Sequence, residues 1–367
     1  MLRRSHKKSK NGCDQCKQRH VKCDECRPTC RLCTSSDLRC SYSDSGPSPD
    51  PSDVSTGTPS STLNTFDNVI NMQHMDLFVH LVTRRDLFSL GDPVKDYKAT
   101  FDVCLLESVK APYLLHQMLA FSARHLSVLH HYRKEEYYNQ ALNLRDRAIS
   151  LFNATRREVD SSNCVAIMLF SVTLGHHLLA DALSCCGTQG LEGFLNRYLS
   201  CVNLNRGIYN IAVSAWPLLV ESEIEPVLSW SRKQTAKEPT GSECEPLLSL
   251  IHMSTWLDEF EKEACYAAIQ YLQLGFDALV SEDEGIRYRM IFHWTLLMSP
   301  EFKRLLSQRK PEALVLLGYY GLLLYHGRTL WQVHNAGEWL IKCVQEHLGP
   351  GWLMWLKYPI RMLQETV

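Results

Sequence analysis

The sequence lacks the features by which many enzymes and membrane proteins are identified. None of the motifs G-x-S-x-G, H-E-x-x-H, G-x-x-x-x-G-K and G-x-G-x-x-G occurs, so no common catalytic or phosphate-binding motif supports an enzyme. The longest nearly unbroken apolar run, Ala313–Tyr325, has 13 residues, whereas a helix needs about 20 to cross a bilayer. Met1–Asn11 is basic and has no apolar stretch, which argues against a secretory signal and an oxidising compartment. We expect neither catalysis nor a membrane span.

Net charge is also nearly absent, but the charges are unevenly distributed. The chain of 367 residues has 39 Lys and Arg and 40 Asp and Glu, a net charge of −1. Residues 1–45 carry eleven basic and five acidic side chains, a net charge of +6, which leaves −7 for the rest. A basic segment joined to an acidic remainder is typical of nucleic-acid binding at one end of a chain.

Seven of the fifteen cysteines fall within residues 13–40 of this basic segment. Six of them form a C-x2-C-x6-C unit that occurs twice, with an offset of 17 residues. In a reducing compartment such a cluster favours metal over disulfides. Structural zinc takes four ligands, so six thiolates satisfy two ions only if two of them bridge both. The spacing therefore predicts a binuclear cluster of two Zn²⁺ held by Cys13, Cys16, Cys23, Cys30, Cys33 and Cys40.

This cysteine segment, with Pro28 between its two halves, resembles the Zn2Cys6 binuclear-cluster DNA-binding domain of fungal transcription factors. The resemblance implies that Cys13 and Cys30 are the bridging ligands and that Pro28 lies in the loop joining the halves. It also implies a sequence-specific regulator of RNA polymerase II genes that binds double-stranded DNA at a CGG-like element. The implied localisation is the nucleus, with cytoplasmic retention before activation as an alternative.

The two halves of the repeat differ in charge. Between Cys16 and Cys23 the sequence has four basic or titratable side chains, whereas the equivalent stretch, residues 34–39, has one acidic and one basic residue. Because Arg and Lys donate to guanine O6 and N7 or bind phosphates, we expect the first half to contact DNA and the second to act as a scaffold. By the resemblance, Arg19, His20 and Lys22 contact bases and Lys17 meets phosphate, although His20 stands where many members have Lys or Arg.

Cys26 is a seventh cysteine in the loop between the halves. Together with His20 it would give eight ligands, as in a cross-braced, ubiquitin-ligase type of interaction module, which is the alternative. Such modules need a long segment between their second and third ligands, but His20 follows Cys16 after three residues. We expect Cys26 to be a free thiol.

Composition divides the chain into three segments. Residues 1–42 form the zinc domain with its basic N-terminal arm, Arg3–Lys10, and residues 43–64 form a disordered linker. Of the twenty residues Ser43–Thr62, nineteen are Ser, Thr, Pro, Gly or Asp, which cannot build a core. Residues 65–367 form a large regulatory domain. No apolar heptad follows Cys40, so homodimerisation is expected to use this domain.

Residues 65–367 show helical rather than strand periodicity. Apolar residues recur at i, i+3, i+4 and i+7 in Ala111–His131, and we expect an all-α domain of about ten helices with a break at Ser231–Cys244. Ala313–Tyr325 is apolar nearly all round, which indicates a central buried helix. For His176 and His177, core packing is favoured over a metal site.

All eight Trp lie in the last 152 residues, which fits either a core or the wall of a lipophilic pocket. The run Ala313–His326, Trp339 and the closing Trp355–Ile360 are similar to the C-terminal domain of the sterol uptake control regulators. This resemblance implies an all-helical domain that dimerises and binds a sterol or another lipophilic effector. A body without a ligand and an enzymatic body are the alternatives.

Overall fold

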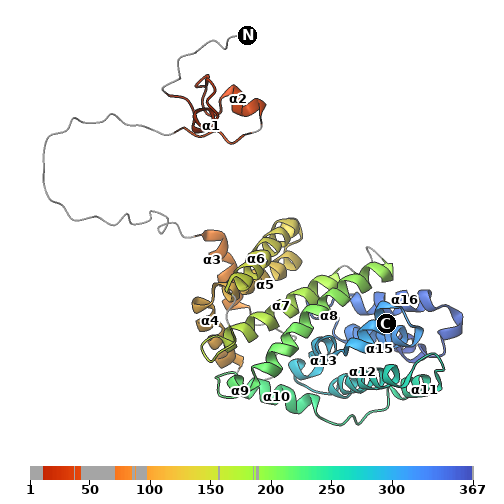
Figure 1. The fold of residues 1–367 in the computed structure, drawn as a ribbon. Coiled ribbons are helices and arrows are strands. Elements are labelled where there is room, and N and C mark those ends of the chain that lie inside the picture. Colours follow the sequence, from red (N-terminus) through yellow and green to blue (C-terminus); the bar gives the residue numbers. More distant parts are fainter. Residues whose placement is uncertain are drawn as a thin grey trace. The chain divides into compact units, whose positions relative to one another are not determined.

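The computed structural model of the chain describes residues 11–36, 38–42, 71–84, 87, 97–155, 158–184, 186 and 190–365. The chain divides into two compact units, residues 1–68 and 69–367, here called the head and the body (Figure 1). The predicted basic arm and the predicted linker lie outside the described residues.

The head contains two short helices that begin in the same way. In α1 (Asp14–Gln18) the sulfur of Cys13 accepts a hydrogen bond from the Cys16 amide at 3.4 Å, and in α2 (Arg31–Ser35) Cys30 does the same for Cys33 at 3.4 Å. Each first cysteine thus satisfies a backbone N–H that the helix leaves without a partner. The sequence repeat is therefore a structural repeat.

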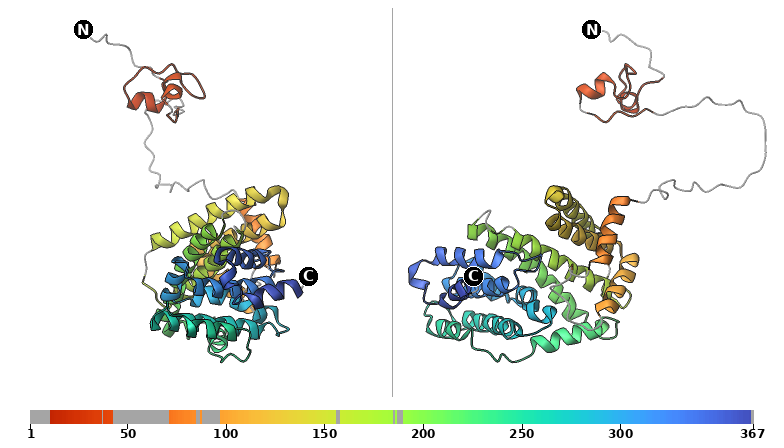
Figure 2. Two further views of the ribbon diagram at one scale, coloured as in Figure 1. Left: turned by 90° about the vertical axis from the view of Figure 1, so that its right-hand side faces the viewer. Right: turned by 180° about the vertical axis from the view of Figure 1, so that it is seen from behind.

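The body is built from helices, and its described residues contain no strand (Figure 2). Its helices are α3 (Met72–Thr83), α4 (Tyr97–Lys110), α5 (Pro112–Leu129), η2 (His131–Arg133), α6 (Lys134–Thr155), α7 (Cys164–Ser184), α8 (Gly190–Ser214), α9 (Trp216–Leu219), α10 (Glu225–Thr235), α11 (Glu245–Met253), α12 (Glu259–Ala278), α13 (Glu284–Leu297), α14 (Pro300–Ser307), α15 (Pro311–His326), α16 (Ala336–Leu348), η3 (Pro350–Trp352) and α17 (Lys357–Glu365). The predicted fold class, a zinc-cluster domain joined to a large all-α domain, is confirmed.

Two details of the helix prediction are wrong. The described body has fifteen α-helices rather than about ten, because helices as short as α9, with 4 residues, have too few turns to show an apolar stripe. The predicted break Ser231–Cys244 begins too early: residues 231–235 belong to α10, whereas residues 236–244 form the break between α10 and α11. The polar composition of residues 231–235 suggested a break, but a tertiary contact supports the helix there. The Ser231 hydroxyl lies 2.9 Å from Nε2 of His293 on α13.

Local capping explains several helix starts. Asp258 and Glu261 form a capping box at α12, in which the Glu261 amide donates to Asp258 at 2.8 Å and the Asp258 amide donates to Glu261 at 3.1 Å. Ser299 accepts from the Phe302 amide at 3.1 Å ahead of Pro300, the first residue of α14. Such pairs satisfy amides that no helical carbonyl reaches.

Helix α15 is the central buried helix, as predicted. Every residue from Glu312 to Tyr325 is buried, and the helix packs against α12, α13 and α16 (Figures 1 and 2). The Tyr320 ring stacks on Trp294 at 4.4 Å, and its hydroxyl donates to the Ile291 carbonyl at 2.8 Å. On α16, a Cβ at Gly337 would lie 2.2 Å from the Tyr325 amide nitrogen, so this close helix contact requires glycine.

Helix α7 is long and apolar enough to cross a membrane by length and composition alone. In the body, however, 67 % of its most apolar stretch is buried. Buried core helices pass the same test, so the helix is weak evidence for a span.

The two histidines of α7 pack in the core, as expected. His176 stacks on Phe292 with a ring-centroid distance of 3.8 Å, and His177 is fully buried, with Nδ1 3.3 Å from the Gln117 amide. Burial lowers the pKa of His176 to about 3 and that of His177 to about 4. Both rings are therefore neutral at pH 7.

The buried histidines predict a loss of stability in acid. Below pH 6.5 the unfolded chain protonates His176 but the folded chain does not until about pH 3, so the free energy of unfolding falls as the pH falls through this window. His176→Phe keeps the stack on Phe292. Between pH 7 and pH 5 the free energy of unfolding should fall by about 1–2 kcal/mol less in this variant than in the wild type. Urea unfolding followed by helical circular dichroism measures this; parallel pH profiles would contradict it.

Candidate metal centre and nucleic-acid interface

The six repeat cysteines of the head gather into two overlapping groups of sulfurs. Within each group all sulfur atoms lie within 4.8 Å of one another. Cys13 and Cys30 belong to both groups. The groups are Cys13, Cys16, Cys23 and Cys30, and Cys13, Cys30, Cys33 and Cys40.

The spacing of these sulfurs fits two tetrahedral metal sites that share an edge. Zn–S bonds of about 2.3 Å place the sulfurs of one tetrahedron about 3.8 Å apart. The Cys13–Cys30, Cys13–Cys33 and Cys16–Cys30 sulfur pairs are each separated by 3.7 Å. The donor set therefore suits two Zn²⁺ ions, with the shared pair where a binuclear cluster needs its bridges.

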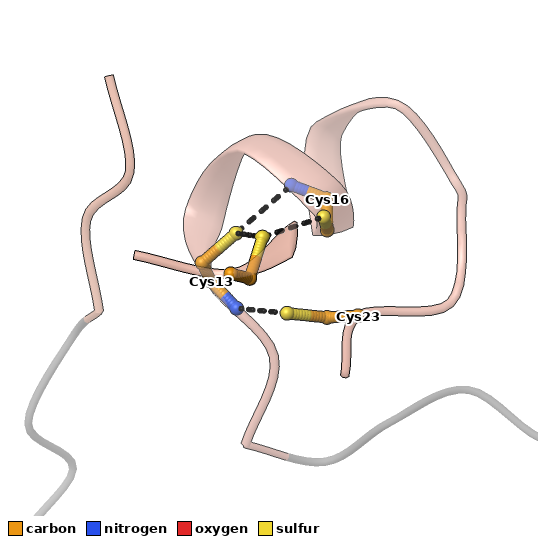
Figure 3. A group of neighbouring side chains, drawn as sticks. Cys13, Cys16 and Cys23 are labelled. Atoms are coloured by element: carbon orange, nitrogen blue, oxygen red, sulfur yellow. Dashed lines mark hydrogen bonds between the residues drawn. The ribbon is translucent and has the colours of Figure 1, made fainter. Parts of the chain in front are cut away.

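Backbone amides support the sulfurs in the same way in each half. Figure 3 shows Cys13, Cys16 and Cys23 turned toward one another. The Cys13 amide donates to the Cys23 sulfur at 3.4 Å, and 17 residues later the Cys30 amide donates to the Cys40 sulfur at 3.4 Å. This bond from Cys30 lowers the pKa of Cys40, because it favours the thiolate.

Burial acts in the opposite direction at Cys16. It raises the pKa of this thiol to about 12, so burial in the folded cage favours the protonated thiol. Because zinc binds thiolates, it must displace this proton when it binds. The cage therefore needs the positive charge of the ions to hold its buried thiolates.

Tyr42 also belongs to the metal centre, and the sequence analysis missed it. Its hydroxyl lies 3.8 Å from the Cys23 sulfur and donates to the Cys26 carbonyl at 2.8 Å. Arg27 lies over its ring at 4.9 Å. A tyrosine next to a polar segment gives no periodic signal that would have identified it.

Cys26 and His20, which the alternative zinc module would need, lie outside both sulfur groups. Cys26 is exposed, and the nearby charge of Asp24 raises its pKa. His20 is exposed and has a left-handed backbone, with φ 54°. Neither residue is placed to complete a cross-braced site.

The four predicted DNA-contacting residues occupy α1 and the turn that follows it. Lys17, Arg19, His20 and Lys22 are all exposed. The turn is fixed by two helix-ending bonds, from the His20 amide to Lys17 at 3.2 Å and from the Val21 amide to Cys16 at 3.1 Å. This is the Schellman arrangement, in which the residue after the helix takes a left-handed conformation. The cationic side chains thus stand on the short stretch of backbone between two cluster cysteines, Cys16 and Cys23.

Comparison with known proteins identifies the class of the head. Residues 11–48 match the model of the fungal Zn(2)-Cys(6) binuclear cluster domain. The head is such a domain, and its six clustered cysteines are the ligand set for two zinc ions.

Three relatives extend this result. The chain is 62 % identical over 40 residues to sterol uptake control protein 2 of Saccharomyces cerevisiae and 58 % identical over 40 residues to the protein of the same name from Candida albicans. It is 25 % identical over 336 residues to the Zn(2)-C6 fungal-type transcription factor afumD of Aspergillus fumigatus. This match covers 85 % of this chain and 84 % of the relative.

These matches cover very different shares of the chain. The two sterol uptake matches cover 11 % of this chain and only 4 % and 6 % of the relatives. They do not test the resemblance of the body to a sterol-binding domain. The longer match extends the similarity to a named fungal transcription factor along most of the chain.

The sulfur geometry predicts different outcomes for two single cysteine substitutions. Cys26→Ser should keep two zinc ions per chain, because Cys26 lies outside both groups. Cys13→Ser removes a sulfur from both groups and should lose both ions together with the fold of the head. Metal analysis by inductively coupled plasma mass spectrometry measures the stoichiometry. Zinc loss in Cys26→Ser would overturn the ligand assignment.

Proposed function

We propose that the chain is a nuclear, sequence-specific transcription regulator whose head reads a CGG-like element in the major groove. Its two zinc ions are held by the six repeat cysteines, with Cys13 and Cys30 as bridges. The proposed organisation is a DNA-binding segment (residues 1–42), a linker (43–64) and a helical regulatory body (65–367). The body senses an effector and carries out no catalysis.

The contrast between the two structural repeats carries the DNA proposal. The same sulfur bonds and helix starts occur in both halves, so the fold alone does not require the basic residues of the first half. Arg19 is equivalent to Ser36, and Lys17 to Thr34. The extra positive charge of the first half is explained by contact with phosphates and base edges.

Arg19→Ala should weaken binding to the selected DNA site by about 1–3 kcal/mol and relax its base preference, while the zinc content stays at two ions. The repeat supplies a matched control pair, because Lys22 and Arg39 occupy equivalent, exposed positions. Lys22→Ala should reduce affinity more than Arg39→Ala. Fluorescence anisotropy at fixed salt measures both effects, and unchanged affinity and preference in Arg19→Ala would refute the role.

We also propose that the body forms a homodimer through α3. Four apolar side chains of this helix, Met72, Met75, Val79 and Val82, are between 40 % and 72 % exposed. Their spacing of three, four and three residues is that of the a and d positions of paired helices. The buried face of α3 is separate and uses Leu77 and Leu81.

Selection of DNA sites from a random pool by the purified chain tests the element and the dimer together. A dimer should recover two triplets at a fixed spacing, and a monomer should recover one. Recovery of unrelated sequences would contradict the CGG-like assignment.

The proposed lipophilic effector, with a sterol as one candidate, would occupy a cavity of about 780 Å³ in the body. Its lining combines apolar side chains such as Val128, Leu183 and Trp331 with the polar Gln332 and with charged side chains, among them Arg124 and Lys134. Gln332 is 2 % exposed, and its Oε1 has no hydrogen-bond partner. A hydroxyl group on an otherwise apolar ligand would satisfy this acceptor.

Val128→Trp should fill part of this cavity and reduce the lipid that organic solvent extracts from the purified chain, as measured by mass spectrometry. Val280→Trp is the control, because Val280 is 89 % exposed and does not line the cavity. Equal lipid recovery from both variants, or none from the wild type, would exclude a lipid ligand at this site.

A further inference from the structure

A second hollow of the body, of about 350 Å³, combines aromatic side chains with a buried acid. It lies between the end of α11, the start of α15 and the segment around η3. Its lining includes the three tryptophans Trp256, Trp352 and Trp355, and also Glu312. The described residues that line it include no Lys, Arg or His.

Glu312 is the unusual member of this group. It is 2 % exposed, and its Oε1 accepts a hydrogen bond from the Ser254 hydroxyl at 2.6 Å. Its other oxygen, Oε2, is buried and has no hydrogen-bond partner. Buried carboxylates are costly unless they are paired, and the start of a helix offsets only part of this cost. The neighbouring buried acid, Glu261, differs because it pairs with Arg304 at 2.8 Å.

We propose that this hollow binds a small organic cation that carries a methylated ammonium group. Tryptophan faces attract cations, and their apolar area suits the methyl groups that a quaternary ammonium presents. The Glu312 carboxylate attracts the charge through the poorly screened interior without needing direct contact. A metal ion is disfavoured because Ca²⁺ and Mg²⁺ require several oxygen ligands, and this hollow offers one carboxylate.

The exposure of the aromatic residues agrees with an open site. Trp256 is 78 % exposed, whereas Trp352 and Trp355 are half-buried against the core. Two indoles are thus held in place, while the third stands at the rim, where a ligand would cover it. This site does not depend on the DNA or lipid proposals.

Isothermal titration of the full chain with choline tests the charge requirement. The matched control ligand is 3,3-dimethylbutan-1-ol, which has the same shape without the charge. Choline should bind at least about tenfold more tightly than the alcohol. Nε-trimethyllysine is the second probe. If it binds more tightly than choline, the natural ligand is a methylated lysine side chain; if it binds more weakly, the natural ligand is a choline-type head group. Equal affinity for choline and the neutral alcohol would overturn the proposal.

Substitutions localise the binding. Glu312→Gln keeps the shape and the Ser254 contact, and Trp256→Ala removes an exposed side chain that the fold does not need. Each should weaken choline binding by about tenfold. Phe260→Ala is the matched control, because Phe260 is 76 % exposed but does not line the hollow, and it should bind as the wild type does. Wild-type affinity in both test variants would exclude this site, and Trp256→Ala keeps the test valid if Glu312→Gln fails to fold.

Discussion

The bonds between sulfur and zinc are the interaction on which the head depends. Its buried cluster consists of five cysteines, with Cys40 and Tyr42 packed against it, and contains no aliphatic side chain. Val21, Leu32 and Leu38 are 38–39 % exposed instead of forming a core. A segment of this size cannot bury enough apolar surface to fold alone, so metal binding must supply the folding free energy. The positions of the exposed basic side chains on α1 and just after it depend on these bonds.

The two halves of this cluster share their backbone and sulfur geometry but differ in charge. Both halves use the same sulfur caps and cross-bonds, 17 residues apart. The metal constrains the cysteines and the turns between them, but it leaves the exposed positions free to vary. Arg19 and Ser36 are equivalent in the backbone and differ in chemistry. This difference in charge, rather than the shared fold, is the reason for proposing that the first half binds DNA.

The sequence predicted the head far better than the body for a physical reason. Zinc ligation depends on spacings of two and six residues, so the six ligands and the need for two shared ones could be inferred from local pattern. The family resemblance implied that Cys13 and Cys30 are the shared pair, and both belong to the two sulfur groups. The buried helix α15 was found because its apolar run is long. The short helices and the Glu312–Ser254 contact, which joins residues 58 apart, depend on tertiary packing. No local pattern encodes such contacts, and the tryptophans that surround Glu312 looked equally suited to a core.

Net charge has little meaning for this chain, because charges act over short distances. Screening limits the field of an exposed charge to about 8 Å at physiological ionic strength, so the charges next to α1 affect its surface more than the sum over the chain does. Inside the body the situation reverses: Glu312 is buried and poorly screened, so one carboxylate has more effect on its neighbours than several exposed ones. The effect of a charge in either unit therefore depends on where it lies and how well it is desolvated. The sum of −1 combines +6 in residues 1–45 with −7 in the rest of the chain and therefore describes neither part.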